Sequence, residues 1–95
     1  MSVADTIRAK LTEEFRPEAL VIEDESSRHR GHAGARPGGE THFRVRIVSR
    51  AFEGASRVDR QRRIYDALSE ELRGQVHALA LTALTPAEAV VRPTS

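Results

Sequence analysis

Apolar side chains recur at every fourth position near the start of the chain, and this spacing predicts a helix over residues 2–15. Ser2 and Asp5 match a capping box at the helix start. Pro17 predicts the helix end, because the residue before a proline is biased away from helical geometry. The apolar stripe consists of Val3, Ile7, Leu11 and Phe15.

The pattern then changes to the two-residue alternation of strands. Residues 19–24 are rich in branched apolar side chains and predict a first strand. Residues 42–49 alternate more cleanly and predict a second strand, with one face made of Phe43, Val45 and Ile47 and the other of His42, Arg44 and Arg46. Because no helix lies between them, we expect an antiparallel pair.

Residues 26–41, between these strands, have no periodic pattern. This segment holds four of the six glycines, together with His29 and His32. Glycine gains little from regular structure and loses much backbone entropy in it. A loop this long in so small a domain is more often functional than not, and we expect it to project from one end of the sheet.

A second helix is predicted over residues 56–73, after a turn at 50–55 that places Phe52 in the core. Ser56, followed three residues later by Asp59, supplies the cap. The apolar positions predict a buried face made of Val58, Ile64, Tyr65, Leu68 and Leu72.

A third strand is predicted over residues 76–84, where Leu79 and Leu81 share a face. His77 stands at the start of this strand and is expected at the rim of the core. Strand, helix and strand form a crossover unit, which predicts parallel neighbours. The run Thr85-Pro86-Ala87-Glu88 carries the start signals of a short last helix.

These elements predict an α+β fold of order αββαβα, with a three-stranded mixed sheet and helices packed on one face. We expect a single domain over residues 1–95, with residues 92–95 as a C-terminal tail. A chain of 95 residues can bury a modest core.

Composition narrows the possible functions. The chain has no cysteine, which excludes disulfides and a thiolate metal site made by this chain alone. The first residues lack the apolar region of a secretory signal, and no apolar run approaches the roughly 20 residues that span a bilayer. We therefore expect a cytoplasmic protein without membrane contact.

Arginines crowd the first half of the second predicted helix. Positive charge near a helix N-terminus opposes the macrodipole, so helix stability does not explain them. They are either a solvated face or a contact surface for an anion. Together with two arginines of the second strand they form the candidate DNA-binding set, which is Arg57, Arg60, Arg62, Arg63, Arg44 and Arg46. The net charge of +1 and the scarce aromatics predict weak affinity.

Enzymatic chemistry has no support in the sequence. No serine, threonine or carboxylate stands beside a histidine in a recognisable nucleophile arrangement, and no phosphate-binding loop is present. We expect a protein that is not an enzyme.

Four segments occur in an order and spacing that resemble one known family. They are Asp24-Glu25-Ser26 leading to His29, then Gly39-Glu40-Thr41-His42-Phe43-Arg44-Val45, then Phe52-Glu53-Gly54 followed by Arg60-Gln61-Arg62-Arg63-Ile64-Tyr65, and finally Val76-His77-Ala78-Leu79-Ala80-Leu81 with Thr85-Pro86-x-Glu88. This is the BolA family, and the resemblance extends over nearly the whole chain.

The resemblance to the BolA family implies a fold related to type II KH domains. It also implies a partnership with monothiol glutaredoxins, in which the two proteins share or hand over a [2Fe-2S] cluster. Some members are described as DNA-binding regulators. Two features depart from the pattern: Arg60-Gln61-Arg62 stands where the family commonly has Arg-His-Arg, and no G-x-x-G lies between two helices. The KH likeness is therefore one of fold more than of site.

The resemblance also implies which residues would hold the cluster. His77 occupies the family's C-terminal ligand position, and His29 is favoured over His32 as the second ligand because it follows Glu25-Ser26 at the family's spacing. Without a thiol, this chain could offer only imidazoles, so a glutaredoxin cysteine and a glutathione would supply the sulfur. Only neutral imidazole binds metal, so cluster binding should weaken below about pH 6.

Several alternatives remain open at this point. A zinc ion held by His29, His32 and His77 is compatible with the residue types. His42 is interpreted as a hydrogen-bonded surface histidine. The leading hypothesis is a non-enzymatic iron–sulfur partner protein in cluster trafficking or iron regulation, a monomer or weak homodimer when free. The alternative is a DNA-binding transcriptional regulator.

Overall fold

The computed structural model describes residues 2–25, 42–74 and 76–91. Its elements are, in order, α1 (Val3–Phe15), β1 (Ala19–Asp24), β2 (His42–Val48), η2 (Arg50–Phe52), α2 (Arg57–Ala67), α3 (Ser69–Arg73), β3 (Ala78–Leu84) and α4 (Pro86–Val91). The predicted succession of helices and strands is confirmed. The segment 26–41 and the tail 92–95 lie outside the described residues.

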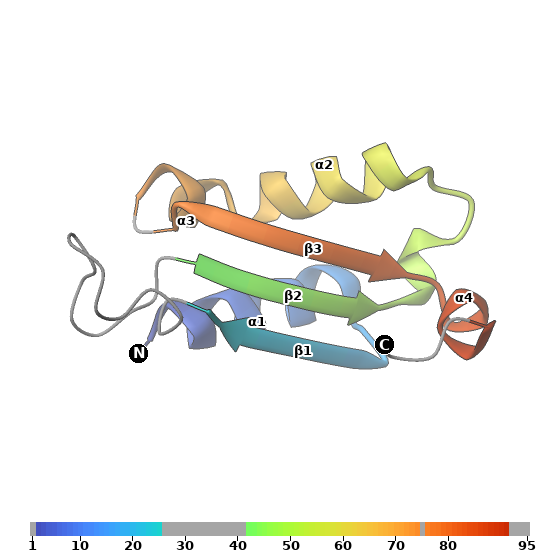
Figure 1. Ribbon diagram of the computed structural model, residues 1–95. Coiled ribbons are helices and arrows are strands. Elements are labelled where there is room, and N and C mark those ends of the chain that lie inside the picture. Colours follow the sequence, from blue (N-terminus) through green and yellow to red (C-terminus); the bar gives the residue numbers. More distant parts are fainter. Residues whose placement is uncertain (1, 26–41, 75, 92–95) are drawn as a thin grey trace.

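The sheet has the strand order β1-β2-β3. β1 runs antiparallel to β2, with Ile22 opposite Val45, and β2 runs parallel to β3, with Val45 opposite Leu81. Figure 1 shows α1 behind the sheet, α2 running along the β3 side, and α4 beyond the end of β3. The predicted α+β class with a three-stranded mixed sheet is confirmed.

The core lies between the sheet and the two longer helices. β2 contributes Phe43, Val45 and Ile47 from one face, as its alternation predicts. Phe15 and Phe52 bring their ring centroids to 5.1 Å, a separation at which tilted aromatic pairs attract. The helices add Ile7 and Leu11 from α1, and Ile64 and Leu68 from the second helical region.

Both ends of α1 follow local signals. Ser2 Oγ accepts a hydrogen bond from the Asp5 N–H at 3.0 Å, and Asp5 Oδ2 accepts one from the Ser2 N–H at 3.3 Å, which completes the predicted capping box. The helix ends where Arg16 takes the left-handed conformation, with φ of 45°, before Pro17. The buried Ser49 Oγ donates to the Phe15 carbonyl at 2.6 Å and joins this helix end to the end of β2.

The predicted buried face of the second helix is only partly right. Ile64 and Leu68 are buried, but Val58 is 54% exposed and Tyr65 is 40% exposed. Arg60 is buried in their place and is only 7% exposed. Residues 60, 64 and 68 follow one another at the helical spacing of four, so the helix is rotated relative to the face that the apolar residues predict.

The predicted single helix over residues 56–73 is divided in two at Leu68. Leu68 leaves helical geometry, with φ of −106° and ψ of 20°, while its side chain stays in the core. The chain changes direction there, and α3 comes close enough to α1 for Lys10 to bridge to Glu70 and Glu71.

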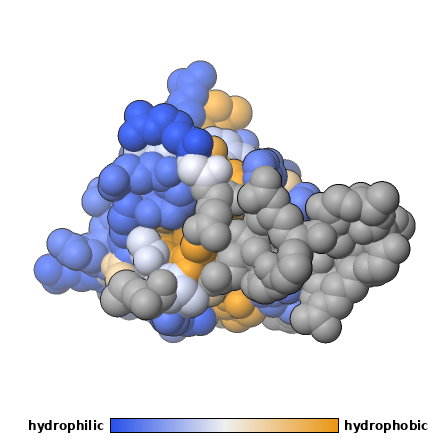
Figure 2. All heavy atoms as spheres, turned by 90° about the vertical axis from the view of Figure 1, so that its left-hand side faces the viewer, coloured by the Kyte–Doolittle hydropathy of each residue, from blue (hydrophilic) through white to orange (hydrophobic). Residues whose placement is uncertain are grey.

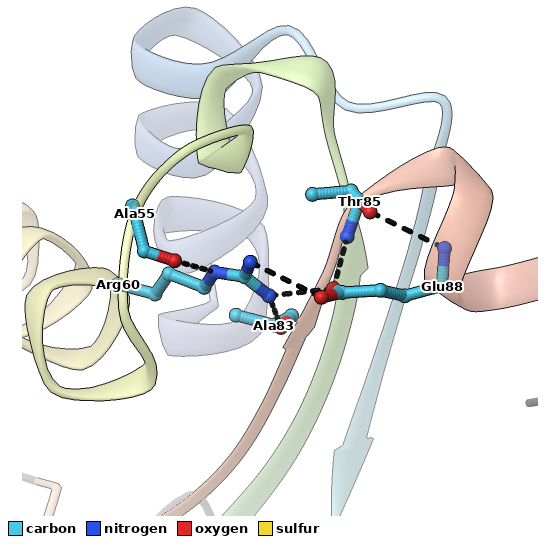
Figure 3. Close-up of polar contacts among 5 residues, drawn as sticks. All are labelled: Ala55, Arg60, Ala83, Thr85 and Glu88. Carbon is cyan, nitrogen blue, oxygen red and sulfur yellow. Dashed lines mark hydrogen bonds and ion pairs between the residues drawn. The ribbon is translucent and has the colours of Figure 1, made fainter.

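Arg60 can be buried because all three nitrogens of its guanidinium group make hydrogen bonds (Figure 3). It donates to the carbonyls of Ala55 and Ala83, at 3.0 Å each. It also forms a two-pronged ion pair with Glu88, at 2.6 and 3.2 Å. Glu88 in turn closes a capping box with Thr85, accepting from its N–H at 2.8 Å. This cluster joins α2, the end of β3 and the start of α4.

The Arg60–Glu88 pair should make stability depend on pH. The hydrogen bond from Arg60, aided by the Thr85 N–H, lowers the pKa of Glu88 from its ordinary value of 4.5 to about 2. The ionised carboxylate therefore stabilises the fold above about pH 4.5, and this contribution is lost as the pH falls toward 2. In thermal unfolding, Glu88→Gln should lower the melting temperature at neutral pH, and its difference from the parent protein should shrink between these two pH values.

A matched control is Glu53→Gln, at an exposed carboxylate that has no ion pair within the described ranges. This variant should follow the parent protein across the same pH range. A melting difference for Glu88→Gln that stays constant down to pH 2 would contradict the role given to the pair.

Candidate functional site

One edge of the sheet gathers three chain segments. β1 ends there at Asp24, β2 begins there at His42, and β3 begins there at Ala78. His42 and Ala78 stand opposite one another in the parallel register. This edge is on the left in Figure 1, where α3 leads into β3. Glu25 and His42, which flank the segment 26–41, therefore lie at the same edge as the residue before β3.

Backbone and side-chain bonds close this edge between β1 and β2. The Glu25 N–H donates to the His42 carbonyl at 2.7 Å, one step beyond the last paired residues of the strands. The Glu25 carboxylate also lies 3.1 Å from Arg44 Nε. Both residues that flank the segment 26–41 on the described side are thus fixed relative to the sheet.

His77 is held by the backbone on both sides, while its imidazole is exposed. Before it, Val76 is buried and its N–H donates to the Glu71 carbonyl at 3.0 Å. After it, Ala78 starts the ladder of β3. The predicted strand start at residue 76 is wrong by two residues, so His77 precedes β3 and its side chain is exposed. An exposed imidazole on a fixed backbone can reach a bound metal centre without a change in the fold.

The approach to His77 is supported from α1. Lys10 Nζ lies 2.9 Å from Glu71 Oε2 and 3.1 Å from Glu70 Oε1. Hydrogen bonds to Glu71 and Glu70 raise the pKa of Lys10, and the bond to Lys10 lowers the pKa of Glu70. These pairs tie α3 to α1, and α3 positions the turn that leads into His77.

Of the three histidines predicted as ligands, the structure describes His77 alone. His29 and His32 lie outside the described residues, so their predicted role as ligands, and the zinc alternative that needs both, stay predictions. Within residues 2–25, 42–74 and 76–91, no group of three or more histidine, cysteine or acidic side chains is arranged to hold a metal ion.

His42 is a neighbour of His77 that the sequence reasoning set aside. The register places His42 opposite Ala78, the residue after His77, so the two histidines belong to adjacent strands at the same edge. The sequence pattern already indicated that His42 and His77 are close, because a crossover unit makes its two strands parallel and parallel strands begin at the same edge. His42 is half-buried, and it makes an interaction of its own.

The candidate DNA-binding arginines do not form one surface. Arg60 must be removed from the set, because it is buried in the cluster with Glu88. Arg63 donates to the Ala51 carbonyl at 3.1 Å. Arg44 and Arg46 belong to the face of β2 opposite the core residues, whereas α2 packs on the core side. The exposed arginines of α2, which are Arg57, Arg62 and Arg63, therefore lie on the other side of the sheet.

The surface around the His77 edge is largely polar. Figure 2 looks onto this end of the molecule, and its described surface is mainly hydrophilic with smaller hydrophobic areas between. Across the part of the chain that the structure describes, no helix has the length and apolar character needed to cross a membrane.

Comparison with known proteins gives one consistent result. The family model described as "BolA: BolA-like protein" matches residues 11–88. The chain is 51% identical over 86 residues to BolA-like protein 1 of Mus musculus, covering 90% of this chain and 60% of that protein. It is 52% identical over 86 residues to "SufE-like protein 1, chloroplastic/mitochondrial" of Arabidopsis thaliana, covering 86% of this chain and 23% of that protein. The chain thus spans less than two thirds of the length of both relatives.

A bacterial relative and a solved structure extend the comparison. The "DNA-binding transcriptional regulator BolA" of Haemophilus influenzae is 43% identical over 88 residues, which cover 93% of this chain and 82% of that protein. The structure of BolA1 from Arabidopsis thaliana matches with a TM-score of 0.83 and 47% identity, over 93% of this chain and 96% of that one. The similarity therefore includes both sequence and fold.

The exposure of His77 leads to a prediction about stability. Because its imidazole is exposed, His77→Ala should change the free energy of unfolding by less than about 0.5 kcal/mol. The adjacent Val76→Ala, at a buried side chain, should cost on the order of 2 kcal/mol. Urea unfolding measures both. A His77 variant as destabilised as the Val76 variant would show that the imidazole belongs to the fold.

Proposed function

The chain belongs to the BolA-like family, and from this premise we propose that it is a non-enzymatic iron–sulfur partner protein. It binds a monothiol glutaredoxin and supplies histidine ligands to a [2Fe-2S] cluster that the two proteins share. Its role is in cluster trafficking or iron regulation. No membrane takes part, and the free protein is a monomer or weak homodimer.

The observation that carries this proposal is the position of His77. Its exposed imidazole stands at the sheet edge to which the described ends of the segment 26–41 are also fixed. That segment contains His29 and His32. Two imidazoles from this chain could therefore reach a common iron atom without any rearrangement of the sheet.

The chain can supply the imidazole ligands of a cluster site but not the sulfur ligands. Iron–sulfur clusters are commonly held by thiolates, and two imidazoles can replace two thiolates on one iron. This chain has four histidines and no cysteine, so its contribution is restricted to imidazole. A glutaredoxin cysteine and a glutathione would supply the remaining ligands. When bound, a histidine-ligated cluster has a raised reduction potential, which suits transfer or sensing.

The location of the protein is part of the proposal. We propose the cytoplasm as its compartment. The name of the Arabidopsis relative refers to the chloroplast and the mitochondrion.

The test is anaerobic purification of the chain together with a monothiol glutaredoxin and glutathione, followed by iron and sulfide analysis. A stable complex should contain about two irons and two sulfides per heterodimer, the content of one [2Fe-2S] cluster. His77→Ala should change the visible absorption of this complex. An unchanged spectrum would remove His77 as a ligand.

Single replacements of the other histidines assign the second ligand. His29→Ala should change the spectrum more than His32→Ala. His42→Ala serves as the matched control at the same sheet edge and should leave the spectrum unaltered. A response to His42→Ala alone would move the second ligand from the segment 26–41 to the start of β2.

DNA binding is the second candidate, favoured by the name of the Haemophilus relative. Because the exposed arginines occupy two faces, one face should dominate any such binding. Fluorescence anisotropy with a labelled duplex should show a loss for the double variant Arg57→Ala/Arg62→Ala or for Arg44→Ala/Arg46→Ala, but not equally for both. Each lost phosphate contact should reduce the salt slope by about one. Equal, additive losses would indicate only nonspecific charge.

A further inference from the structure

β3 is an outermost strand of the sheet, and its long side that faces away from β2 is open. This open side is distinct from the edge of strand ends at which His77 stands. The sheet order β1-β2-β3 leaves its outer side without a partner strand within the described residues. Two hydrogen bonds show which peptide groups of β3 point toward β2 and which point outward. The Leu84 carbonyl accepts from the Ser49 N–H on the β2 side, and the Ala83 carbonyl accepts from Arg60 on the outer side. Since successive residues alternate, the N–H and C=O groups of Leu79 and Leu81 also point outward.

This open edge lacks the usual protection against pairing. Natural edge strands are commonly blunted by charged side chains, by proline or by a bulge. β3 reads ALALTAL, seven residues without a charge or a proline, and its register with β2 is unbroken. The opposite edge strand β1 is shorter and ends in Glu23 and Asp24. An added strand therefore finds its template on β3.

α2 forms a wall beside this edge. A hollow of about 200 Å³ lies between them, lined on the helix by Arg57, Arg60 and Gln61, on the strand by residues 81–84, and on α4 by Glu88, whose carboxylate is paired with Arg60. Figure 1 shows α2 running along β3. The guanidinium of Arg60 closes the hollow at Ala83, where it occupies the last outward carbonyl.

The flank of α2 next to the hollow is apolar and basic. Val58 and Tyr65, seven residues apart, share one side of the helix, and both are largely exposed. Gln61, which lines the hollow, lies between them on that side. Arg57 and Arg62 border the same flank and have no ion pair with any residue in the described ranges.

We propose that the outer edge of β3, with this flank of α2, binds an extended acidic segment of another protein as a fourth strand. The backbone of such a segment would pair with Leu79 and Leu81, as in other cases of strand addition. Its apolar side chains would cover Val58 and Tyr65, and its carboxylates would meet Arg57 and Arg62. On the strand the hollow begins at Leu81, about 13 Å from His77 at 3.3 Å per residue, and the site uses none of the histidines, so the proposal goes beyond the proposed cluster function.

Charge and chemistry favour this occupant over two others. A second copy of the chain would bring the uncompensated Arg57 and Arg62 toward positive charges of the same flank. A single-stranded nucleic acid would find no basic residue on β3, and Tyr65 alone for stacking on the α2 flank. The outward peptide groups of Leu79 and Leu81 match a peptide backbone instead.

The test is a titration of the ¹⁵N-labelled protein, followed by amide chemical shifts. The probe is a blocked eight-residue peptide, Val-Thr-Glu-Thr-Val-Thr-Glu-Thr, which places valine and glutamate on the same strand face, and the matched probe contains lysine in place of glutamate. The acidic peptide should give saturable shifts at Leu79, Leu81 and along α2. The outward amides of Leu79 and Leu81 should shift more than the inward amides of Ala80 and Thr82.

Paired variants locate the site. Arg57→Glu should weaken binding of the acidic peptide about fivefold, while Arg63→Glu, on the opposite flank of the same helix, should change it by less than about twofold. Glutamate near a helix N-terminus is favourable, so Arg57→Glu should fold. Val58→Glu should also weaken binding, and Val21→Glu, at an equally exposed valine of β1, should not.

A further probe separates backbone pairing from charge alone. N-methylation of alternate residues of the acidic peptide removes its pairing donors on one side and should abolish the shifts at β3. The proposal is overturned if the methylated or lysine peptide binds as well as the acidic one, or if the shifts lie outside β3 and α2. It is equally overturned if the edge responds only to oligothymidine, or only to the protein's own concentration.

Discussion

The parallel pairing of β2 with β3 is the constraint on which the arrangement of the molecule depends. A parallel pair needs a crossover, which α2 and α3 supply, and it starts both strands at the same edge. That edge therefore holds His77, His42 and the end of β1. An antiparallel β3 would have sent His77 to the opposite end of the sheet, far from Glu25 and His42, which flank residues 26–41.

Most of the fold could be predicted because its signals are local. The capping residues of α1, α2 and α4 and the alternation in β2 and β3 depend on a few neighbouring positions, and each was confirmed. The buried face of α2 could not be predicted in this way. Arg60 is stable in the interior only because Glu88, 28 residues later, completes its bonds. Apolar periodicity alone therefore assigned Val58 and Tyr65 to the core.

As with the fold, some features of the candidate site follow from short stretches of sequence and others only from the tertiary structure. The residue pattern placed His77 at the start of a strand, and the family resemblance gave it a role. The structure added which edge that start occupies and what else is fixed there. The nearness of His42 to His77 follows from the register, which no short stretch of sequence contains, although the crossover pattern implies it. The roles of His29 and His32 rest on the resemblance, and the residues on either side of their segment, Glu25 and His42, lie at this edge.

The arginines of α2 show why a cluster of like charges cannot be read as one surface. Arg60 is part of the interior, and Arg63 bonds to the carbonyl of Ala51. Arg57 and Arg62 are left without an ion pair among the described residues, and Arg57 stands at the helix N-terminus, where positive charge is unfavourable. Neither packing nor helix stability accounts for these two. They border an apolar flank beside an uncharged open strand, and a partner that is both extended and acidic would match all three features at once.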